Sequence, residues 1–434
     1  MGIPGVGAVT WRPTSAHLMW LVWLALAAGQ TARVVATGSL MSGDGVYHFA
    51  HLHSIVVDHD LDPVNEIRYF REQARSPYTG QPKIGDRPPR HPSTGEVLNK
   101  YPIGLALLTL PAYVAVYVVS HGLAAAGVPA DVSGYGWTYQ YFVGLLIAAY
   151  AVLGLWCCQR VATARELTAG DGWWATLLVA SATPWLFYAT LEPFFSHTLS
   201  ATSAALLAWH WLRARTGDRP TQWSVTGIIA GVAATIRYQD AVLLVIPGLD
   251  LFTSVRRRPR EVMVRGLALG AGTLVGVLPQ LAVNYHLFGN PFTTGYFGEE
   301  FSYWRSPLLL YTLTSADVGL VRWAPIVALA LAGLVIGAWR GWPHARVGLV
   351  VVGVQVYMVS SWFFVSQGHS FGNRMLVNCT VFFVVGLAGV LAAAGKRPRL
   401  RASIQTAGVL LAGVNLLLMW LWCRGAIGPL GRLG

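Results

Sequence analysis

The feature that most constrains this chain is a succession of apolar blocks of about 20 residues, the length that a helix needs to cross a bilayer. Inside lipid the backbone finds no water, so each block must be a helix that satisfies its own hydrogen bonds. Only 12% of the 434 residues are charged, against about 25% in an average soluble domain. The chain is therefore predicted to be an all-α, polytopic transmembrane helical bundle.

About eleven segments are predicted to span the membrane, within a single integral domain that covers residues 1–434. They lie at 18–36, 139–159, 172–190, 195–212, 223–236, 241–255, 266–285, 323–339, 347–365, 375–395 and 403–422. The first is interpreted as a retained span and not as a signal peptide, because no small-residue cleavage site directly follows its apolar core.

Lysine and arginine mark one side of the predicted membrane. Short basic junctions follow alternate spans, at 160–165, 213–219, 256–265, 340–346 and 396–401. Because basic junctions face the cytoplasm, we expect a cytoplasmic N-terminus and a large outer loop at 37–138. The expected location is the cell (inner or plasma) membrane, with the polar residues gathered on its outer face.

The apolar segment 101–123 conflicts with this alternation, because a full span there would place the later basic junctions on the wrong side. It contains Pro102 and Pro111 and precedes a turn-rich stretch. We therefore predict a juxtamembrane or re-entrant helix on the outer side, which is tolerated where protein covers it. A hairpin of two true spans is the alternative, and the absence of lysine and arginine from 124–138 argues against it.

Charge and cysteine content exclude several classes of partner. The formal net charge is +12, but the basic residues sit in short junctions and form no basic face on a soluble domain, so no nucleic-acid partner is expected. The four cysteines lie in or beside apolar blocks without CxxC spacing. They indicate neither a disulfide framework nor a zinc site.

Asp44 is the candidate catalytic residue. It follows the first predicted span between two glycines, so a substrate can approach the backbone closely there. A partly desolvated carboxylate near the membrane surface can act as a general base. Its alternative role is to cap the helix that follows. Tyr47 and His48, in the same segment, are candidate substrate-binding residues.

Two further groups of polar residues lie on the predicted outer side. The run from Asp58 through Asp60 to Asp62 offers hard oxygen ligands, which raises a divalent metal as a candidate cofactor. A turn before Pro63 is the favoured alternative, because aspartate is common in turns. Glu192 and His197 lie at a tight turn, where both reach toward the cavity beneath the large loop or simply cap helices at the interface.

Three cations at predicted outer helix ends are candidate phosphate ligands, namely Lys100, Arg237 and Arg374. The topology of the predicted spans does not explain an arginine at position 237, which favours an anion contact. The alternative role of Arg237 is an ion pair with Asp240. Arg374 closes a glycine-bearing turn whose N–H groups can face a phosphate, and arginine suits such oxyanions. A carboxylate beside several cations suits a lipid-phosphate substrate, since the carboxylate can deprotonate a hydroxyl while the cations stabilise the leaving phosphate.

Several short stretches occur in an order that resembles a known family: GDGVYHFAHLHSIVVDHDLDPVNE, NKYPIGLALLTLPAY, TPWLFYATLEPFFSH, GVAATIRYQDAVLLVIP, NYHLFGNPFTTGY, TSADVGLVRWAPI and HSFGNRM. The chain resembles the GT-C-fold glycosyltransferases, which include protein O-mannosyltransferases, the aminoarabinose transferases of lipid A and the Rgt-type bacterial family. The resemblance implies a polyprenyl-phosphate-linked sugar donor and a hydroxyl acceptor on a glycan, lipid or protein. It also implies inverting transfer on the outer face, with Asp44 as base.

The chain departs from that family at one position. Many members carry two adjacent acids where Gly45 follows Asp44 here, so a second carboxylate would come from Asp58, Asp60 or Glu192. A multi-pass lipid or solute transporter is the alternative function, which the absence of a convincing internal repeat disfavours. A structural membrane protein without catalysis is the third interpretation.

Overall fold

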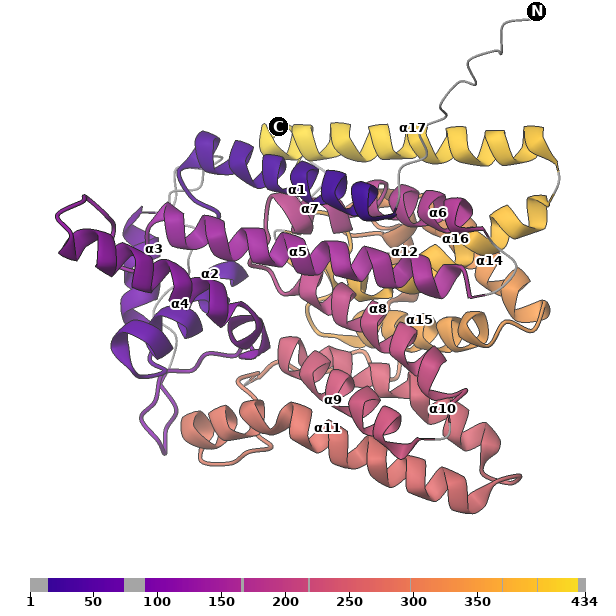
Figure 1. Cartoon of the computed structure of the whole chain (residues 1–434), viewed down its shortest axis with the longest axis horizontal. Coiled ribbons are helices and arrows are strands. Elements are labelled where there is room, and N and C mark those ends of the chain that lie inside the picture. Colours follow the sequence, from indigo (N-terminus) through magenta and orange to yellow (C-terminus); the bar gives the residue numbers. More distant parts are fainter. Residues whose placement is uncertain are drawn as a thin grey trace, which may run out of the picture.

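The computed structural model describes residues 15–427 except 74–89, 165–167, 218, 297, 369 and 396. Every named element in these ranges is helical (Figure 1). In chain order the elements are α1 (Ser15–Thr37), α2 (Asp44–His53), the π-helix η1 (Ser54–Asp58), α3 (Val64–Gln73), α4 (Gly104–Ala125), α5 (Trp137–Ala162), α6 (Ala169–Ser181), α7 (Trp185–Thr190), α8 (His197–Ala214), α9 (Pro220–Ile236), the 3-10 helix η2 (Tyr238–Leu244), α10 (Val245–Ser254), α11 (Pro259–Phe288), α12 (Leu309–Thr314), α13 (Leu320–Trp323), α14 (Ile326–Trp339), α15 (Pro343–Ser361), the 3-10 helix η3 (Arg374–Cys379), α16 (Thr380–Ala394) and α17 (Pro398–Cys423).

Seven helical stretches of the described chain are long and apolar enough to cross a membrane: α1, α4, α5, α11, α15, the continuous η3–α16 and α17. The prediction of an all-helical membrane bundle is thus confirmed, whereas the count of about eleven spans is not. The other predicted spans coincide with helices that are shorter, less apolar or interrupted. The segment 172–190, for example, is divided between α6 and α7.

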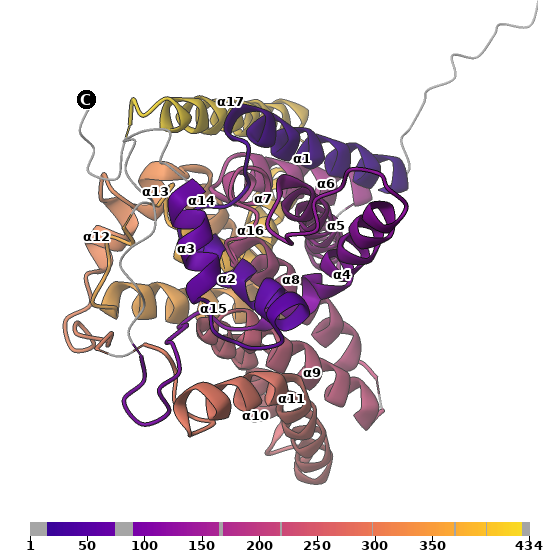
Figure 2. The same cartoon turned by 90° about the vertical axis from the view of Figure 1, so that its left-hand side faces the viewer.

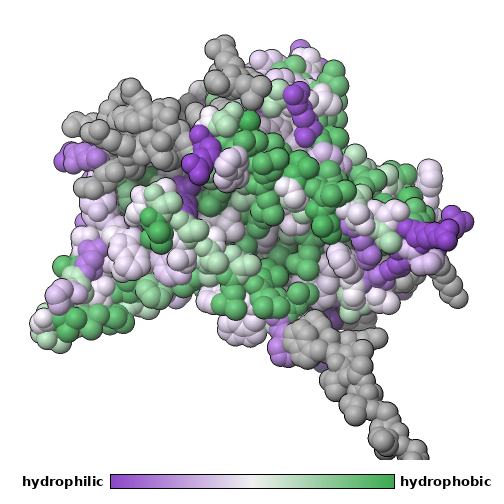
Figure 3. Space-filling view, turned by 90° about the horizontal axis from the view of Figure 1, so that it is seen from above, coloured by the Kyte–Doolittle hydropathy of each residue, from purple (hydrophilic) through white to green (hydrophobic). Residues whose placement is uncertain are grey.

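A broad hydrophobic surface runs across the middle of the molecule, with hydrophilic side chains gathered toward its two ends (Figure 3). Helices α1 and α17 lie along this face. They expose large apolar side chains, among them Trp20, Leu24, Leu410 and Leu417. An apolar surface of this extent is costly in water, whereas lipid tails are as apolar as leucine and solvate it.

Helices α2, α3 and α4, together called the loop helices, gather at the left end of the bundle in Figure 1, and Figure 2 looks onto them. Helix α17 finishes toward the same end. Helix α4 covers most of the segment 101–123, and its length and composition equal those of a span. Its placement as an outer juxtamembrane helix therefore stays a prediction.

Helices α9 and α11 pack through glycines at close range. Each carries two glycines four residues apart, at Gly227 and Gly231 on α9 and at Gly272 and Gly276 on α11. A Cβ atom added at Gly231 would lie 2.3 Å from a backbone oxygen of α11, and one added at Gly276 would lie 2.4 Å from a backbone oxygen of α9. Small residues at this spacing let two backbones approach, so dispersion contacts replace the hydrophobic driving force that lipid removes.

Phe49 fixes helix α2 relative to its neighbours. Its side chain is fully buried and meets three aromatic rings edge-on, with centroid distances of 5.5 Å to Phe70 of α3, 5.7 Å to Tyr113 of α4 and 5.7 Å to Phe194 before α8. Edge-to-face pairs of this kind add about 0.5–1.5 kcal/mol each beyond the buried area. The orientation of α2, whose first residue is Asp44, is therefore set by contacts with three other parts of the chain.

Substitution of Gly276 by alanine should destabilise the protein by about 1–3 kcal/mol, the usual cost of overpacking, because the new methyl group would overlap the backbone of α9. Gly270→Ala is the matched control on the same helix, since a Cβ atom added at Gly270 would meet nothing within 4 Å. Thermal unfolding of both variants in detergent measures the difference. Equal stability of the two variants would contradict close backbone packing of α9 on α11.

Candidate functional site

Interruptions in several helices meet at one place. The chain breaks between α7 and α8, at Arg237 between α9 and η2, and between α15 and η3. Arg237 has extended backbone angles, with φ −149° and ψ 128°. At Gly372 φ is +60°, and an added Cβ atom would lie 2.6 Å from Pro184. In membrane proteins, non-helical backbone is tolerated where protein buries it or where it lines a cavity, so these breaks direct attention to the space between them.

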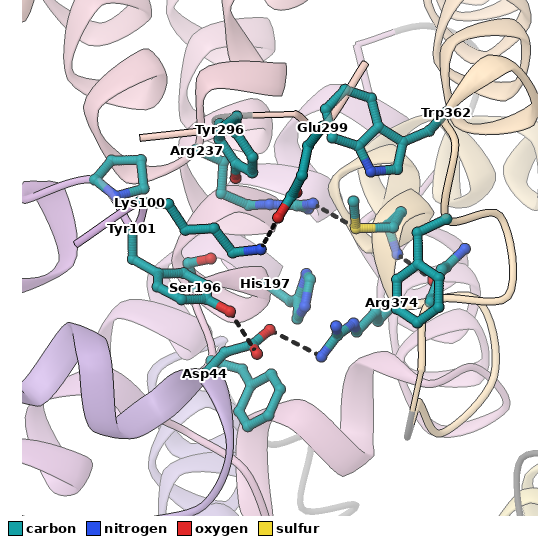
Figure 4. Close-up of a pocket in the computed structure, with 15 residues that line it drawn as sticks. Asp44, Lys100, Tyr101, Ser196, His197, Arg237, Tyr296, Glu299, Trp362 and Arg374 are labelled. Carbon is teal, nitrogen blue, oxygen red and sulfur yellow. Dashed lines mark hydrogen bonds and ion pairs between the residues drawn. The ribbon is translucent and has the colours of Figure 1, made fainter. Parts of the chain in front are cut away.

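A cavity of about 100 Å³ lies where the breaks meet (Figure 4). Its lining residues come from the start of α2, the segment before α4, the start of α8, the α9–η2 break, the segments after α11 and α15, and the start of η3. Two carboxylates, three cations and several aromatic rings face it. They are Asp44 and Glu299; Lys100, Arg237 and Arg374; and Tyr101, Phe195, Tyr296, Trp362 and Phe364.

Asp44 directs its carboxylate across the cavity. One oxygen accepts a hydrogen bond of 2.7 Å from the Tyr101 hydroxyl, and the other pairs with Nη1 of Arg374 at 2.9 Å. The side chain keeps 27% of its surface exposed, so a substrate can reach it. As the first residue of α2 it also lies at the positive end of that helix, but both of its partners come from distant parts of the chain.

Tyr101 is held in place by a short polar segment. Its backbone oxygen lies 3.0 Å from Nε2 of His51, and its backbone N–H donates to Asn99 Oδ1 over 3.0 Å. Two residues on, the backbone N–H of Ile103 donates to Gln280 Oε1 over 2.9 Å. The start of α4 is thereby fixed against both α2 and α11, which brings the Tyr101 hydroxyl to Asp44.

The surroundings of Asp44 keep its carboxyl ionised. Burial by itself raises the pKa, but the Arg374 guanidinium, the Tyr101 hydroxyl and the more distant His48 and Lys100 together hold the pKa of Asp44 below its ordinary value of 3.8. Burial and the Asp44 carboxylate raise the pKa of Tyr101 well above 10.0, so its hydroxyl stays a donor. Burial lowers the pKa of His48 to about 3, so this imidazole is neutral at physiological pH.

Two guanidinium groups carry N–H groups that nothing in the described chain satisfies. Arg237 is only 8% exposed; its Nη2 contacts Gln239 and Met375, each at 2.9 Å, while its Nη1 is buried without a partner. Nε of Arg374 is unpartnered as well. A buried donor without an acceptor costs about 1–3 kcal/mol and more when charged, so the cavity favours an anion with several oxygens.

Asp240, the alternative partner of Arg237, is engaged elsewhere. It accepts hydrogen bonds from Ser200 Oγ at 2.5 Å and from Asn378 Nδ2 at 2.8 Å. These two bonds tie η2 to α8 and η3, and Nη1 of Arg237 keeps no hydrogen-bond partner in the described chain. The predicted role of Arg237 as a phosphate ligand stays a prediction.

Lys100 and Glu299 form an ion pair at the rim of the cavity. The ammonium nitrogen of Lys100 also lies 5.5 Å from the centroid of the Tyr296 ring. The sequence analysis missed Glu299, although the segment 286–322 belongs to the same predicted outer side and contains the acidic pair Glu299-Glu300. A search for every acid on that side would have found it, without showing which acid meets Lys100.

The other predicted site residues occupy different positions. His197 lines the cavity and is 4% exposed. Tyr47 stacks on Tyr101 at 5.1 Å and His48 meets the same ring edge-on at 5.1 Å, so both support Tyr101 from behind without lining the cavity. His369, in the glycine-bearing turn before Arg374, lies outside the described residues.

Neither Glu192 nor Asp60 lines the cavity. Glu192 pairs with Arg33 at 3.1 Å and accepts a hydrogen bond from Ser42. Asp60 is exposed and accepts from the backbone N–H of Asp62 at 3.1 Å, which is the turn geometry that was the alternative for this run. The carboxylate that shares the cavity with Asp44 is Glu299.

Comparison with known proteins gives a distant likeness in structure alone. No family model matches this chain, and no curated protein does. Among solved structures it is similar to the archaeal oligosaccharyltransferase AglB from Archaeoglobus fulgidus in complex with an inhibitory peptide and a dolichol-phosphate, with 11% identity and a TM-score of 0.48. The alignment covers 96% of this chain and 56% of that chain. This chain thus spans about half the length of that protein.

Replacement of Asp44 by asparagine should destabilise the protein in a pH-dependent way. Because the pKa of Asp44 is lowered in the folded state, its stabilising contribution is fully present above an unfolded pKa of about 3.9 and is lost as the pH falls through the folded pKa. Thermal unfolding between pH 7 and pH 3 should show a constant difference from wild type down to about pH 5 that shrinks below about pH 4. Asp60→Asn is the control, and a difference that vanishes near pH 6 would contradict this account.

Proposed function

We propose that this chain is a membrane glycosyltransferase of the GT-C type, which moves a sugar from a polyprenyl-phosphate donor to a hydroxyl acceptor on the outer face of the cell membrane. One observation carries the proposal. An oriented carboxylate, Asp44, shares a small cavity with Arg237 and Arg374, whose buried N–H groups lack acceptors. The N-terminus is proposed to be cytoplasmic, and the loop helices to lie on the outer side.

Arg374 suits a position between base and leaving group. Its Nη1 pairs with Asp44, and its Nε is free. Since a guanidinium donates in a fixed planar fork, a phosphate held at Nε would lie beside the carboxylate and not against it. Arg237 Nη1 would supply a second donor to the same phosphate, and Lys100 would add a positive charge at the rim.

The proposed reaction is an inverting displacement. Asp44 accepts the proton of the acceptor hydroxyl as the oxygen attacks the anomeric carbon, and the bond between that carbon and the phosphate oxygen breaks. The polyprenyl phosphate leaves with the bonding electrons, and its charge is stabilised by donors already in place. The lowered pKa of Asp44 makes it a weak base, so its contribution depends on orientation by Tyr101 and Arg374.

The aromatic rim is suited to the sugar and to the first isoprene units. Trp362 meets Tyr296 edge-on at 5.7 Å and Phe301 at 5.0 Å. Such rings offer broad apolar faces with few rotatable bonds, which suits the C–H faces of a pyranose and the methyl groups of a polyprenol. These rings lie beside Lys100 and Glu299, so the polar and apolar parts of a lipid-linked sugar would meet matching surfaces.

Asp44→Asn should lower the transfer rate by more than about 100-fold, the scale of general-base catalysis, while the protein stays folded. The assay uses purified protein in lipid, a panel of radiolabelled polyprenyl-phosphate sugars and total membrane extract as acceptor. Label that moves to an acceptor with wild type alone supports the proposal. Transport of an unmodified substrate across vesicles, without covalent product from any donor, would instead support the transporter alternative.

Arg237→Gln should weaken donor binding by about 10- to 100-fold, because a hydrogen bond to a charged group contributes about 1.5–3 kcal/mol. Arg256→Gln is the matched control, since Arg256 lies in the basic junction after α10, away from the cavity. Titration with a short-chain polyprenyl phosphate measures both. Equal affinity of the two variants would exclude Arg237 as a phosphate ligand.

The transfer rate should stay constant as the pH falls from 7 to about 5. Asp44 has a pKa below 3.8 and His48 has one of about 3, so neither changes its protonation state in that range. A pH–rate profile under saturating donor tests this expectation. An acid limb with a midpoint near pH 6 would assign the base to a histidine instead of Asp44.

A further inference from the structure

A second polar cluster lies outside the cavity, where α2 passes through η1 into α3. His53 is the last residue of α2, Asp58 is the last residue of η1, and Glu66 lies in the first turn of α3. Nδ1 of His53 is 3.0 Å from Asp58 Oδ2 and 3.0 Å from Glu66 Oε1. The three ligand-type atoms all lie within 4.8 Å of one another.

The hydrogen bonds of His53 determine which of its ring nitrogens carries a proton. Its other ring nitrogen, Nε2, lies 3.1 Å from the backbone oxygen of Ser133. A carbonyl oxygen can only accept, so Nε2 carries a proton. In the neutral imidazole, Nδ1 then presents a lone pair to two carboxylate oxygens. Three electron-rich atoms that converge in this way need positive charge between them, which either a metal ion or a proton on Nδ1 supplies.

The two spacings at Nδ1 fit a metal ion. Ligands bound at about 2.0–2.2 Å in tetrahedral or octahedral arrangement lie about 3.0–3.5 Å apart, and both contacts of Nδ1 are 3.0 Å long. The π-helical turn produces this arrangement, since its wider winding brings Asp58 back to His53. Single π-helical turns are frequent at functional sites.

Each of the three side chains is also oriented by a neighbour, as metal ligands usually are. Besides the contact between Nε2 and Ser133, Asp58 Oδ2 accepts from Asn65 Nδ2 at 2.8 Å. Glu66 Oε1 accepts from the Ser54 hydroxyl at 2.9 Å. The ring of Tyr135 stacks on His53 with a centroid distance of 3.9 Å. The imidazole therefore has one orientation.

Glu66 supplies an independent sign of a missing ligand. Its side chain has no exposed surface, and its second oxygen, Oε2, is buried without a hydrogen-bond partner. An orphaned carboxylate oxygen is costly, and bidentate coordination of a metal would satisfy it. Asp58 is 25% exposed, which leaves a route for the ion and for water ligands.

We propose that His53, Asp58 and Glu66 bind one divalent transition-metal ion, with zinc the best match to one imidazole and two carboxylates. Of the oxygen-rich run that the sequence analysis raised as a metal site, only Asp58 takes part, and Asp60 and Asp62 form the turn beyond it. The ion would tie α2, η1 and α3 to the segment that carries Ser133 and Tyr135. It would thereby position the helix that begins at Asp44, and it does not depend on the proposed transfer reaction.

The test is metal analysis of the full-length, tag-free protein, stripped with EDTA and then equilibrated with zinc. Wild type should retain about one zinc per chain and unfold at a higher temperature than the stripped protein. Asp58→Asn and Glu66→Gln should bind at least about 10- to 100-fold more weakly. Asp58 is partly exposed, so Asp58→Asn keeps the test valid if Glu66→Gln fails to fold.

Two control variants separate this site from its surroundings. Asp60→Asn, on the same loop, and Asp44→Asn, in the cavity, should both retain the zinc. Zinc bound equally by wild type and Asp58→Asn, or no zinc in wild type, would overturn the proposal and leave a protonated His53 between two carboxylates. Because Asp44→Asn should lose transfer and keep zinc, failure of the metal proposal is distinguishable from failure of the proposed function.

Discussion

Backbone polar groups find no water inside a bilayer, and the arrangement of this chain follows from that constraint. Long apolar helices satisfy their own hydrogen bonds, and close glycine contacts such as those of Gly231 and Gly276 pack them without hydrophobic assistance. Backbone that leaves the helix must be buried or must line a cavity. The extended residue Arg237 and the breaks before α8 and η3 meet that requirement together, and the cavity with Asp44 lies between them.

The electrostatics of the cavity follow from the same burial. Arg374 and Tyr101 neutralise and orient Asp44, and Glu299 does the same for Lys100. Arg237 is the cavity cation that has no carboxylate partner among the described ion pairs. A low dielectric makes each unsatisfied N–H costly in free energy, and the protein by itself supplies no acceptor for the free N–H groups of Arg237 and Arg374 in the described chain. The oxygens of a phosphate would accept hydrogen bonds from these groups, and the proposed function is based on that match.

The loop helices connect the two proposed sites. Helix α2 begins with Asp44 at the cavity and ends with His53 at the proposed metal site. Phe49, between them, is locked by aromatic rings from three other elements. A metal ion at the far end of α2 would restrict the rotation and tilt of that helix. The direction of the Asp44 carboxylate would then depend on contacts at both ends of a ten-residue helix.

Apolar block length and basic junctions are local properties, so the sequence by itself determined that this chain is an all-helical membrane bundle with Asp44, Lys100, Arg237 and Arg374 as its notable polar residues. It did not determine how many helices are long enough to span, because a proline or glycine break within an apolar block depends on what packs around it. The segment 172–190, divided between α6 and α7, is an example.

Only the tertiary structure decided which polar groups meet. Tyr101 reaches Asp44 across 57 positions, and Glu299 reaches Lys100 across 199. Glu192 and Asp60, the acids expected to assist Asp44, are engaged elsewhere. A π-helical turn that no periodicity indicated brings Asp58 back to His53, and Glu66 of α3 joins them. Such pairings depend on how helices distant in sequence pack together, and hydropathy along the chain carries no information about that.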